Sequence, residues 1–287
     1  MNKFYNVIFA PGFFESSQVL KALLIGTIIA LVSSIFGVFV IVRKQAFVGH
    51  AISDFGGAGA AVAFLLNINT VIGFLFLGVI SAIGAEMLGK KVKERDIATG
   101  VVLSLALGFE SLFLFLDTHY TGHAGAPMMI LFGSVFIVRT STVYLIILIS
   151  AISIIGLCII FRPLLLVSVA PDLAKTQGGY PKLIGIIFVI LLAFVVDESS
   201  VVIGTLLSIA LLVGPAATAM HLTHRIGLAL ISASCFSVIS MWLGILLAYD
   251  SYQWFPSHQS WPVSFFVCTL ILIFYILTRI IGKLKHQ

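Results

Sequence analysis

The chain has 287 residues, of which 60% are hydrophobic and only 9% are charged, and its mean hydropathy is +1.18. A soluble domain typically carries about 25% charged residues, so this composition excludes a water-soluble fold. No long polar stretch divides the chain, and we therefore expect a single domain over residues 1–287. The net charge of +5 is interpreted below through membrane topology and not as a sign of nucleic-acid binding.

The first long apolar run begins near Val19, and it is expected to stay in the membrane. The segment before it does not resemble a cleaved signal peptide, because Pro11, Gly12 and Glu15 interrupt it. A helix needs about 20 apolar residues to cross the hydrocarbon core. The sequence predicts an all-α, polytopic transmembrane bundle of eight or nine spans, at Val19–Val42, Phe47–Leu66, Val71–Leu88, Ile97–Leu116, Val143–Phe161, Leu183–Val196, Val201–Met220, Ile226–Tyr249 and Val263–Ile281.

Two apolar segments do not fit a full crossing. Leu183–Val196 is short for a span, and we expect it to be less tilted or to end in a cavity. Met128–Val138 is too short to cross, so it is predicted to be re-entrant or interfacial.

The distribution of Lys and Arg predicts the orientation, since cytoplasmic loops carry the excess of positive charge. Nine crossings put the termini on opposite sides. If the C-terminus is cytoplasmic, the outer side keeps only Lys3, Lys21 and Arg139 of the 16 cations. The inner side then holds Arg43, Lys44, Lys90, Lys91, Lys93, Arg95, Arg162, Lys175, Lys182, Arg225, Arg279, Lys283 and Lys285. We therefore expect a multi-pass protein of the inner or plasma membrane, with the N-terminus outside.

Three acidic residues, Asp54, Glu86 and Glu110, lie within apolar runs. An ionisable group at membrane depth is costly and usually faces a cavity or a partner. Glu86 lies four residues before Lys90 near the inner interface, which favours a snorkelling ion pair. Glu110 follows Gly108 and is a candidate for the transport path.

His50 and Asp54 form the most informative pair. They are four residues apart, so a helix places both side chains on one face. One imidazole and one carboxylate suit a divalent cation such as zinc or manganese. The alternative interpretation is a structural hydrogen bond between the two side chains.

The outer loop after the fourth predicted span carries His119 and His123, and the last outer loop carries His258. These histidines are candidates for receiving zinc at the pore entrance. The alternative is that they are merely solvated, which is commoner for histidines in loops.

Five motifs in order resemble the permease subunit of ATP-binding-cassette importers for zinc, manganese and iron(II), the ABC-3 family. The resemblance covers nearly the whole chain. The motifs are Arg43–Asp54, Glu94–Gly100, Leu131–Ser134, Pro171–Gly178 and Leu211–Ala219.

The resemblance implies a permease with no permanently bound cofactor, which carries zinc or manganese as its cargo. It also implies a second permease copy, two ATPase subunits and an extracytoplasmic metal-binding protein. The cytoplasmic segment that contacts the ATPase is assigned to Pro171, Asp172, Leu173, Ala174, Lys175 and Gly178. No GxxxxGK[ST] phosphate loop is present in the sequence, so the chain is not expected to be an enzyme and ATP hydrolysis is expected in separate subunits.

One feature departs from the family pattern. The family usually has Asp first and His four residues later, whereas this chain has His50 first and then Asp54. Each ligand therefore moves by about one helical turn, or roughly 6 Å of rise. The geometry of the metal site, and the choice of metal, are open at this stage.

Three other functions are compatible with parts of the sequence. A permease of similar architecture for haem, a siderophore or cobalamin would not need a His/Asp pair. A secondary carrier would use Asp54 and Glu110 as proton sites and would work without an ATPase. An intramembrane enzyme is disfavoured, because the sequence has no GxSxG or HExxH motif.

The predicted orientation can be tested by labelling introduced cysteines. Cysteines at Asn2 and Ser257 are expected to react with a membrane-impermeant reagent added outside, because the charge distribution places both residues on the outer side. A cysteine at Gln287 is expected to react only from the cytoplasmic side. Labelling of Gln287 from outside would overturn the orientation.

Overall fold

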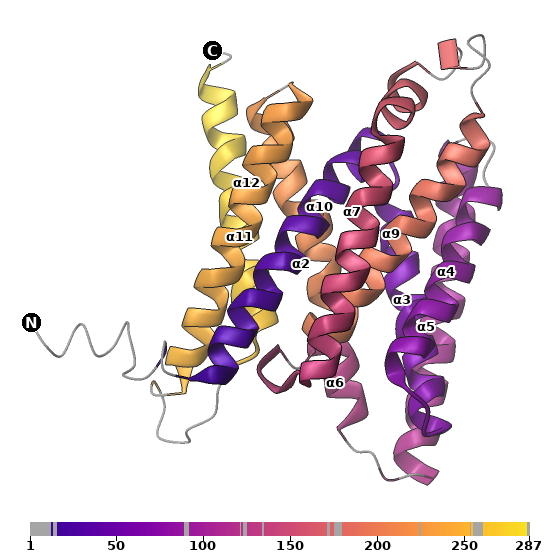
Figure 1. Cartoon of the computed structure of the whole chain (residues 1–287), viewed down its shortest axis with the longest axis vertical. Helices are drawn as coiled ribbons and strands as arrows, with labels where there is room; N and C mark the ends of the chain where they lie inside the picture. Colours follow the sequence, from indigo (N-terminus) through magenta and orange to yellow (C-terminus); the bar gives the residue numbers. More distant parts are fainter. Residues whose placement is uncertain are drawn as a thin grey trace, which may run out of the picture.

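The computed structural model describes residues 13, 16–88, 92–120, 122, 125–133, 135–170, 173–174, 180–223, 225–252, 254 and 261–285. All of the regular structure in these residues is helical (Figure 1). The elements are α2 (Ser17–Val42), α3 (Ala46–Leu65), α4 (Thr70–Leu88), α5 (Val92–Tyr120), α6 (Ala126–Phe132), the 3-10 helix η1 (Val135–Ile137), α7 (Thr140–Val169), α9 (Pro181–Ile203), α10 (Thr205–Leu222), α11 (Ile226–Ser251) and α12 (Val263–Lys285).

Nine helices of the described residues are long and apolar enough to cross a membrane, which confirms the predicted all-α polytopic bundle. They run up and down in turn, so that α2 begins and α12 ends at opposite ends of the bundle (Figure 1). The segment predicted not to cross forms the seven-residue α6 and the three-residue η1. α6 packs against α3, α5, α9 and α10 near one end of the bundle.

The expectation of a short span at Leu183–Val196 is wrong. Helix α9 continues through Asp197 and Glu198 to Ile203 and has 23 residues, enough for a full crossing. The following helix does not begin at Val201 as predicted, because Gly204 separates α9 from α10. The polar Asp197–Ser200 segment looks like a loop in the sequence, but the packed helices around it bury all four residues.

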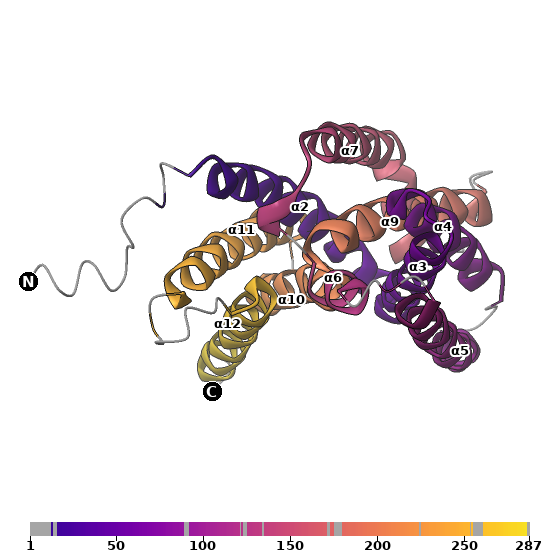
Figure 2. The ribbon, with the colours of Figure 1, turned by 90° about the horizontal axis from the view of Figure 1, so that it is seen from below.

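The bundle has two packed regions that share α2 (Figure 2). In the first, α2 packs against α10 and α11, and α12 packs against these two helices. In the second, α3 packs against α4, α5 and α9, and α7 covers α9. Large buried side chains such as Phe36, Phe39 and Phe188 fill the space between α2, α3 and α9. Helix α3 therefore lies among its neighbours, with 72% of its span buried.

The link between α9 and α10 is a single glycine that packs on another glycine. Gly204 has φ +85° and Gly133, at the end of α6, has φ +72°, a region that glycine reaches without steric cost. A methyl group on Gly133 would overlap the backbone of Ile203, and one on Gly204 would overlap the carbonyl of Leu131. The sharp turn therefore depends on both glycines.

Polar contacts fix one end of α3 and α4. Glu86 accepts a hydrogen bond from Gln45 Nε2 at 2.8 Å and lies 3.5 Å from an Arg43 nitrogen. The guanidinium of Arg43 also lies 5.3 Å from the centre of the Phe188 ring. The partners of Glu86 are thus Gln45 and Arg43, which lie in the turn between α2 and α3. Lys90, the partner expected from the sequence, lies outside the described residues.

Close backbone packing sets the distance between α3 and α4. A methyl group on Gly59 would overlap the Gly73 carbonyl, and one on Gly73 would overlap Gly59 in return. Small residues allow this approach between membrane helices, where packing and not a hydrophobic driving force holds them together.

Gly59→Ala is therefore expected to push α4 away from α3 and to destabilise the protein by about 1–3 kcal/mol, as overpacking does. The matched control is Gly84→Ala on α4, because a methyl group there meets nothing within 4 Å. The measurement is the thermal unfolding midpoint of the purified protein in detergent. Equal midpoints for the two variants would show that the glycine contact does not determine the spacing.

Candidate metal site

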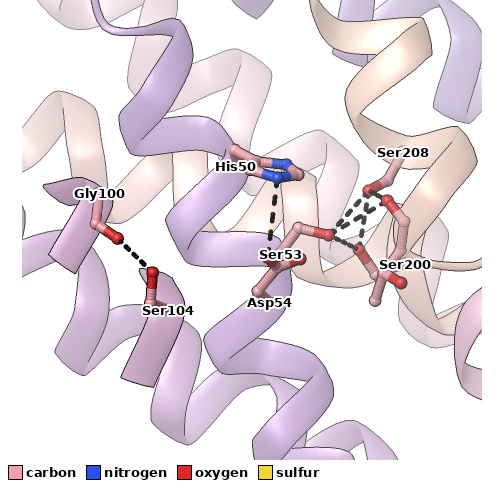
Figure 3. A network of polar contacts seen from close by, with 8 residues as sticks. His50, Ser53, Asp54, Gly100, Ser104, Ser200 and Ser208 are labelled. Atoms are coloured by element: carbon pink, nitrogen blue, oxygen red, sulfur yellow. Dashed lines mark hydrogen bonds and ion pairs between the residues drawn. The ribbon is translucent and has the colours of Figure 1, made fainter. Parts of the chain in front are cut away.

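Helix α3 presents His50 and Asp54 on one face, as the sequence predicts (Figure 3). His50 Nε2 and Asp54 Oδ2 are 3.7 Å apart, which is longer than a hydrogen bond. The His50 side chain is 40% exposed and that of Asp54 is 9% exposed. Among the described residues, His50 Nδ1 and Asp54 Oδ2 have no hydrogen-bond partner. In this structure the pair is not the structural hydrogen bond that the sequence left as an alternative.

The separation of the two atoms suits a shared ion. Ligand bonds from His and Asp to zinc are about 2.0–2.2 Å long. If one ion were bonded to both atoms, the angle between the two bonds at the ion would be roughly 120°. This angle lies near tetrahedral geometry. A closer pair joined by a hydrogen bond would first have to separate.

Glu110 of α5 faces the same side of α3. A methyl group on Gly57 would lie 2.8 Å from Glu110 Oε1, so the carboxylate rests directly against the glycine backbone. Glu110 is buried, and its Oε1 has no hydrogen-bond partner in the described part of the chain. The fold thus brings Glu110 to within about one helical turn of Asp54, since Gly57 follows Asp54 by three residues.

A different face of α3 carries a buried cluster of hydroxyl groups. Ser53 Oγ lies 3.1 Å from Ser200 Oγ of α9 and 3.1 Å from Ser208 Oγ of α10, and the last two are 3.0 Å apart (Figure 3). This cluster joins α3 to both sides of the Gly204 turn. It therefore fixes the rotation of α3 about its axis, which decides where His50 and Asp54 point.

Two acidic residues that fall between the predicted spans Leu183–Val196 and Val201–Met220 are buried within α9. Asp197 is 0% exposed and Glu198 is 2% exposed. Glu198 accepts a hydrogen bond from Ser150 of α7 at 2.7 Å. Their burial was missed because the apolar run was taken to stop at Val196. The shortness of that run was the available signal, since a crossing helix had to continue beyond it.

The remaining predicted site residues lie elsewhere. His119 is exposed at the end of α5, where its ring stacks on Phe115 with centroids 5.9 Å apart. His123 and His258 lie outside the described residues, as do Pro171, Asp172, Lys175 and Gly178 of the predicted ATPase-contacting segment. Of that segment, Leu173 is half exposed and Ala174 is buried.

No group of three or more His, Cys, Asp and Glu side chains that could hold a metal occurs within the described residues. His50 and Asp54 are therefore two potential metal ligands on one helix face, with Glu110 next to them, and this pair is called the half site below. A tetrahedral or octahedral ion needs further ligands from water or from another chain.

Comparison with known proteins identifies the family. Residues 15–278 match the family described as the ABC 3 transport family. The chain belongs to the ABC-3 family. The manganese transport system membrane protein MntC of Listeria monocytogenes is 29% identical over 246 residues, covering 85% of this chain and 86% of that relative. The MntC protein of Halalkalibacterium halodurans is 31% identical over 231 residues, covering 80% and 78%.

A solved structure confirms the architecture. The structure described as PsaBC from Streptococcus pneumoniae in complex with Fab has a TM-score of 0.78 and 23% identity, and the match covers 93% of this chain and 92% of that chain. At this identity the likeness shows the fold alone. Together with the family, the nine apolar helices make this ABC-3 chain a multi-pass membrane protein and a transport subunit, not an enzyme.

Proposed function

We propose that this ABC-3 chain is the membrane-spanning subunit of an importer that moves a divalent transition metal into the cytoplasm, with manganese as the first candidate. The supporting observation is the His50–Asp54 pair, which faces Glu110 inside the bundle. A bare divalent ion can enter the bilayer only if protein ligands replace its water, because burying an unpaired charge is too costly.

The relatives named as manganese transport proteins favour manganese over zinc. The ligand chemistry agrees, since two carboxylates and one imidazole provide mostly oxygen, and oxygen ligands suit manganese. The outer-loop histidines are the candidates for receiving zinc, and of these only His119 is described, stacked on Phe115.

The half site on α3 suggests how the partners take part. A second permease copy, related by a two-fold axis, would add another His50 and Asp54 and complete four ligands. Two ATPase subunits on the cytoplasmic side would supply the energy, and an extracytoplasmic metal-binding protein would deliver the ion. The passing site must bind weakly enough to release the ion, as a partly hydrated site does.

The rival functions differ in their demands on the same residues. A permease for haem, a siderophore or cobalamin would keep transporting after His50 and Asp54 are both replaced. A secondary carrier would transport when the purified chain alone is reconstituted in vesicles. Under the present proposal both experiments give no transport.

Asp54→Asn tests the direct role of the carboxylate. We expect manganese uptake to fall more than tenfold, because the amide keeps the size of the side chain and one acceptor oxygen but loses the charge that offsets the ion's desolvation. Uptake is measured with radioactive manganese and divided by the amount of assembled complex. Glu198→Gln is the matched control, since Glu198 is equally buried but faces Ser150. Near-wild-type uptake by Asp54→Asn contradicts the proposal.

Exchanging the positions of His50 and Asp54 provides a second test of whether this pair meets the ion. Exchanging them, as His50→Asp with Asp54→His, restores the order usual in the family. This double variant is expected to recover part of the uptake that either single alanine variant loses. An exchange that is as inactive as the alanine variants, despite normal assembly, would argue that the pair holds helices together and does not meet the ion.

Coupling to the ATPase is proposed to use the cytoplasmic segment around Leu173. Ala174 is 1% exposed, so a tryptophan there would test internal packing, whereas Leu173 is 50% exposed. Leu173→Asp is expected to lower transport at least fivefold while ATP hydrolysis continues, because a charge removes an apolar docking contact. Leu222→Asp, at the end of α10, is the control at the same end of the bundle. Normal transport by Leu173→Asp would exclude this docking role.

A further inference from the structure

A pocket of about 480 Å³ lies at the end of the bundle where α6 packs (Figure 1). Pockets that hold organic ligands usually measure about 300–1,000 Å³. The pocket is separate from the half site, because its lining residue on α3, Phe64, follows Asp54 by ten residues, or roughly 15 Å of rise. Four crossing helices contribute their ends to its lining, namely Phe64 of α3, Thr70 of α4, Thr142 of α7 and Val202 of α9.

The open side of this pocket faces the surroundings of the bundle. Only 28% of the span is buried in α4 and in α7, whereas 72% is buried in α3 and in α9. Helix α9 lies between α4 and α7 and packs against both (Figure 2). The pocket thus lies between the first turns of two peripheral helices, with the two interior helices behind it. Around a membrane-spanning bundle, the surroundings of peripheral helices are lipid.

The length of α4 sets the depth of the pocket in the membrane. Helix α4 has 19 residues, or roughly 28 Å of rise, which is close to the thickness of the hydrocarbon core, about 30 Å. Its first residue, Thr70, therefore lies at the boundary between hydrocarbon and headgroups, and so does Asn69 before it. Arg139, which precedes the first residue of α7, lines the same pocket. The polar part of the lining is thus level with phospholipid headgroups.

Arg139 brings positive charge to the pocket. It is exposed, and neither of the two salt bridges found within the described residues involves it. Lys21, also exposed, adds a second cation beside it, because its amino group donates a hydrogen bond to Thr140 Oγ1 at 3.4 Å. The acidic residues that the structure describes toward this end of the bundle are all buried, namely Asp117, Asp197, Glu198 and Asp250. The two exposed cations would therefore be complemented by an anion from outside the chain.

The other polar side chains of the lining are hydrogen-bond donors. Ser141 and Thr142 of α7 each carry a hydroxyl group. The side-chain oxygen of Asn69 accepts a hydrogen bond from Val71 N at 3.0 Å, which leaves its amide group as a donor. Among the described residues that line the pocket there is no Asp, Glu, His or Cys. This chemistry does not suit a metal ion, but a guanidinium with neighbouring donors suits a phosphate group.

The rest of the lining is apolar. Phe74, Ile130 and Val202 are buried at the back of the pocket, whereas Ile68 and Ile137 are exposed. A ligand that fills the pocket therefore needs an apolar part as well as an anionic group. A phospholipid has both, with its phosphate at headgroup level and its acyl chains in the hydrocarbon.

We propose that this pocket binds one anionic phospholipid, whose phosphate pairs with Arg139 and accepts hydrogen bonds from Ser141 and Thr142. The first part of an acyl chain would cover Ile68 and the apolar back of the pocket. An anionic lipid such as phosphatidylglycerol is favoured over a zwitterionic one, because Arg139 and Lys21 together contribute two positive charges. The bound lipid would join the start of α4 to the start of α7. This inference goes beyond the proposed transport function and does not rest on it.

The position of the pocket favours lipid over a second copy of the chain. The second permease copy proposed above would meet the half site on the face of α3 where Glu110 of α5 packs. Helices α5 and α7 lie on opposite sides of α9 (Figure 2). The side on which α7 lies is therefore left to the bilayer.

The test measures lipid binding to the full-length chain, purified with its ATPase partner in detergent and freed of native lipid. The complex is titrated with dioleoyl phosphatidylglycerol or dioleoyl phosphatidylcholine, and bound lipids are counted by native mass spectrometry. We expect one tightly held phosphatidylglycerol per chain and binding of phosphatidylcholine that is several-fold weaker. Arg139→Gln is expected to weaken the binding of phosphatidylglycerol at least fivefold, because the charge-assisted contacts to phosphate are lost.

Arg225→Gln is the matched control. Arg225 is also exposed and also precedes the first residue of its helix without a side-chain cap, but it lies at the start of α11, at the other end of the bundle. It is expected to leave the binding of phosphatidylglycerol unchanged. Ser141→Ala with Thr142→Val keeps the charge and removes two donors, and it is expected to weaken binding several-fold. Thermal unfolding midpoints show that each variant is folded.

Several outcomes overturn the lipid site. Equal binding of phosphatidylglycerol by the wild type and Arg139→Gln does so, as does equal loss on Arg225→Gln or equal affinity for the two lipids. Unchanged binding by the Ser141→Ala, Thr142→Val variant would show charge attraction without a pocket. Displacement of the lipid by inorganic phosphate would identify a site for free phosphate. Weaker binding of the extracytoplasmic metal-binding protein by Arg139→Gln, with lipid binding unchanged, would assign the pocket to that protein.

Discussion

Two carboxylates inside this bundle lie where a neighbouring helix presents glycine in place of a side chain. Glu110 rests on Gly57, and Asp197 rests on Gly56 and Gly78. Without Cβ atoms, the helices approach closely enough to exclude lipid from the carboxylates. Because an ionisable group facing hydrocarbon is costly, this contact is the constraint on which the rest of the site depends.

The glycines place two polar faces on one helix. His50 and Asp54 point toward the side on which Glu110 of α5 packs, whereas Ser53 and Gly56 contact α9 and α10. Helix α3 therefore separates two polar regions within an apolar bundle, and its rotation sets both. The Gly59–Gly73 contact with α4 and the serine cluster with α9 and α10 fix that rotation from two different sides.

The fold follows largely from the sequence, and the site follows in part. Apolar runs of about 20 residues have few alternatives to crossing helices, since backbone groups in lipid must bond internally. The i,i+4 spacing placed His50 and Asp54 on one face. The polar Asp197–Ser200 segment was mistaken for a loop, because local polarity gives no information on the helices that surround it. Glu86 was expected near Lys90 but contacts Gln45, a residue 41 positions away.

The sequence by itself determined the membrane class, a number of eight or nine crossings, the family resemblance and the reversed His50–Asp54 pair. These properties depend on composition, on local periodicity or on residues close together in the chain. Only the tertiary structure decided that Glu110 lies against Gly57, that Gly204 divides α9 from α10, and that Asp197 is buried against Gly56 and Gly78. Each of these depends on how distant helices pack, and packing is set by side-chain shape across the whole bundle and not by spacing along one helix.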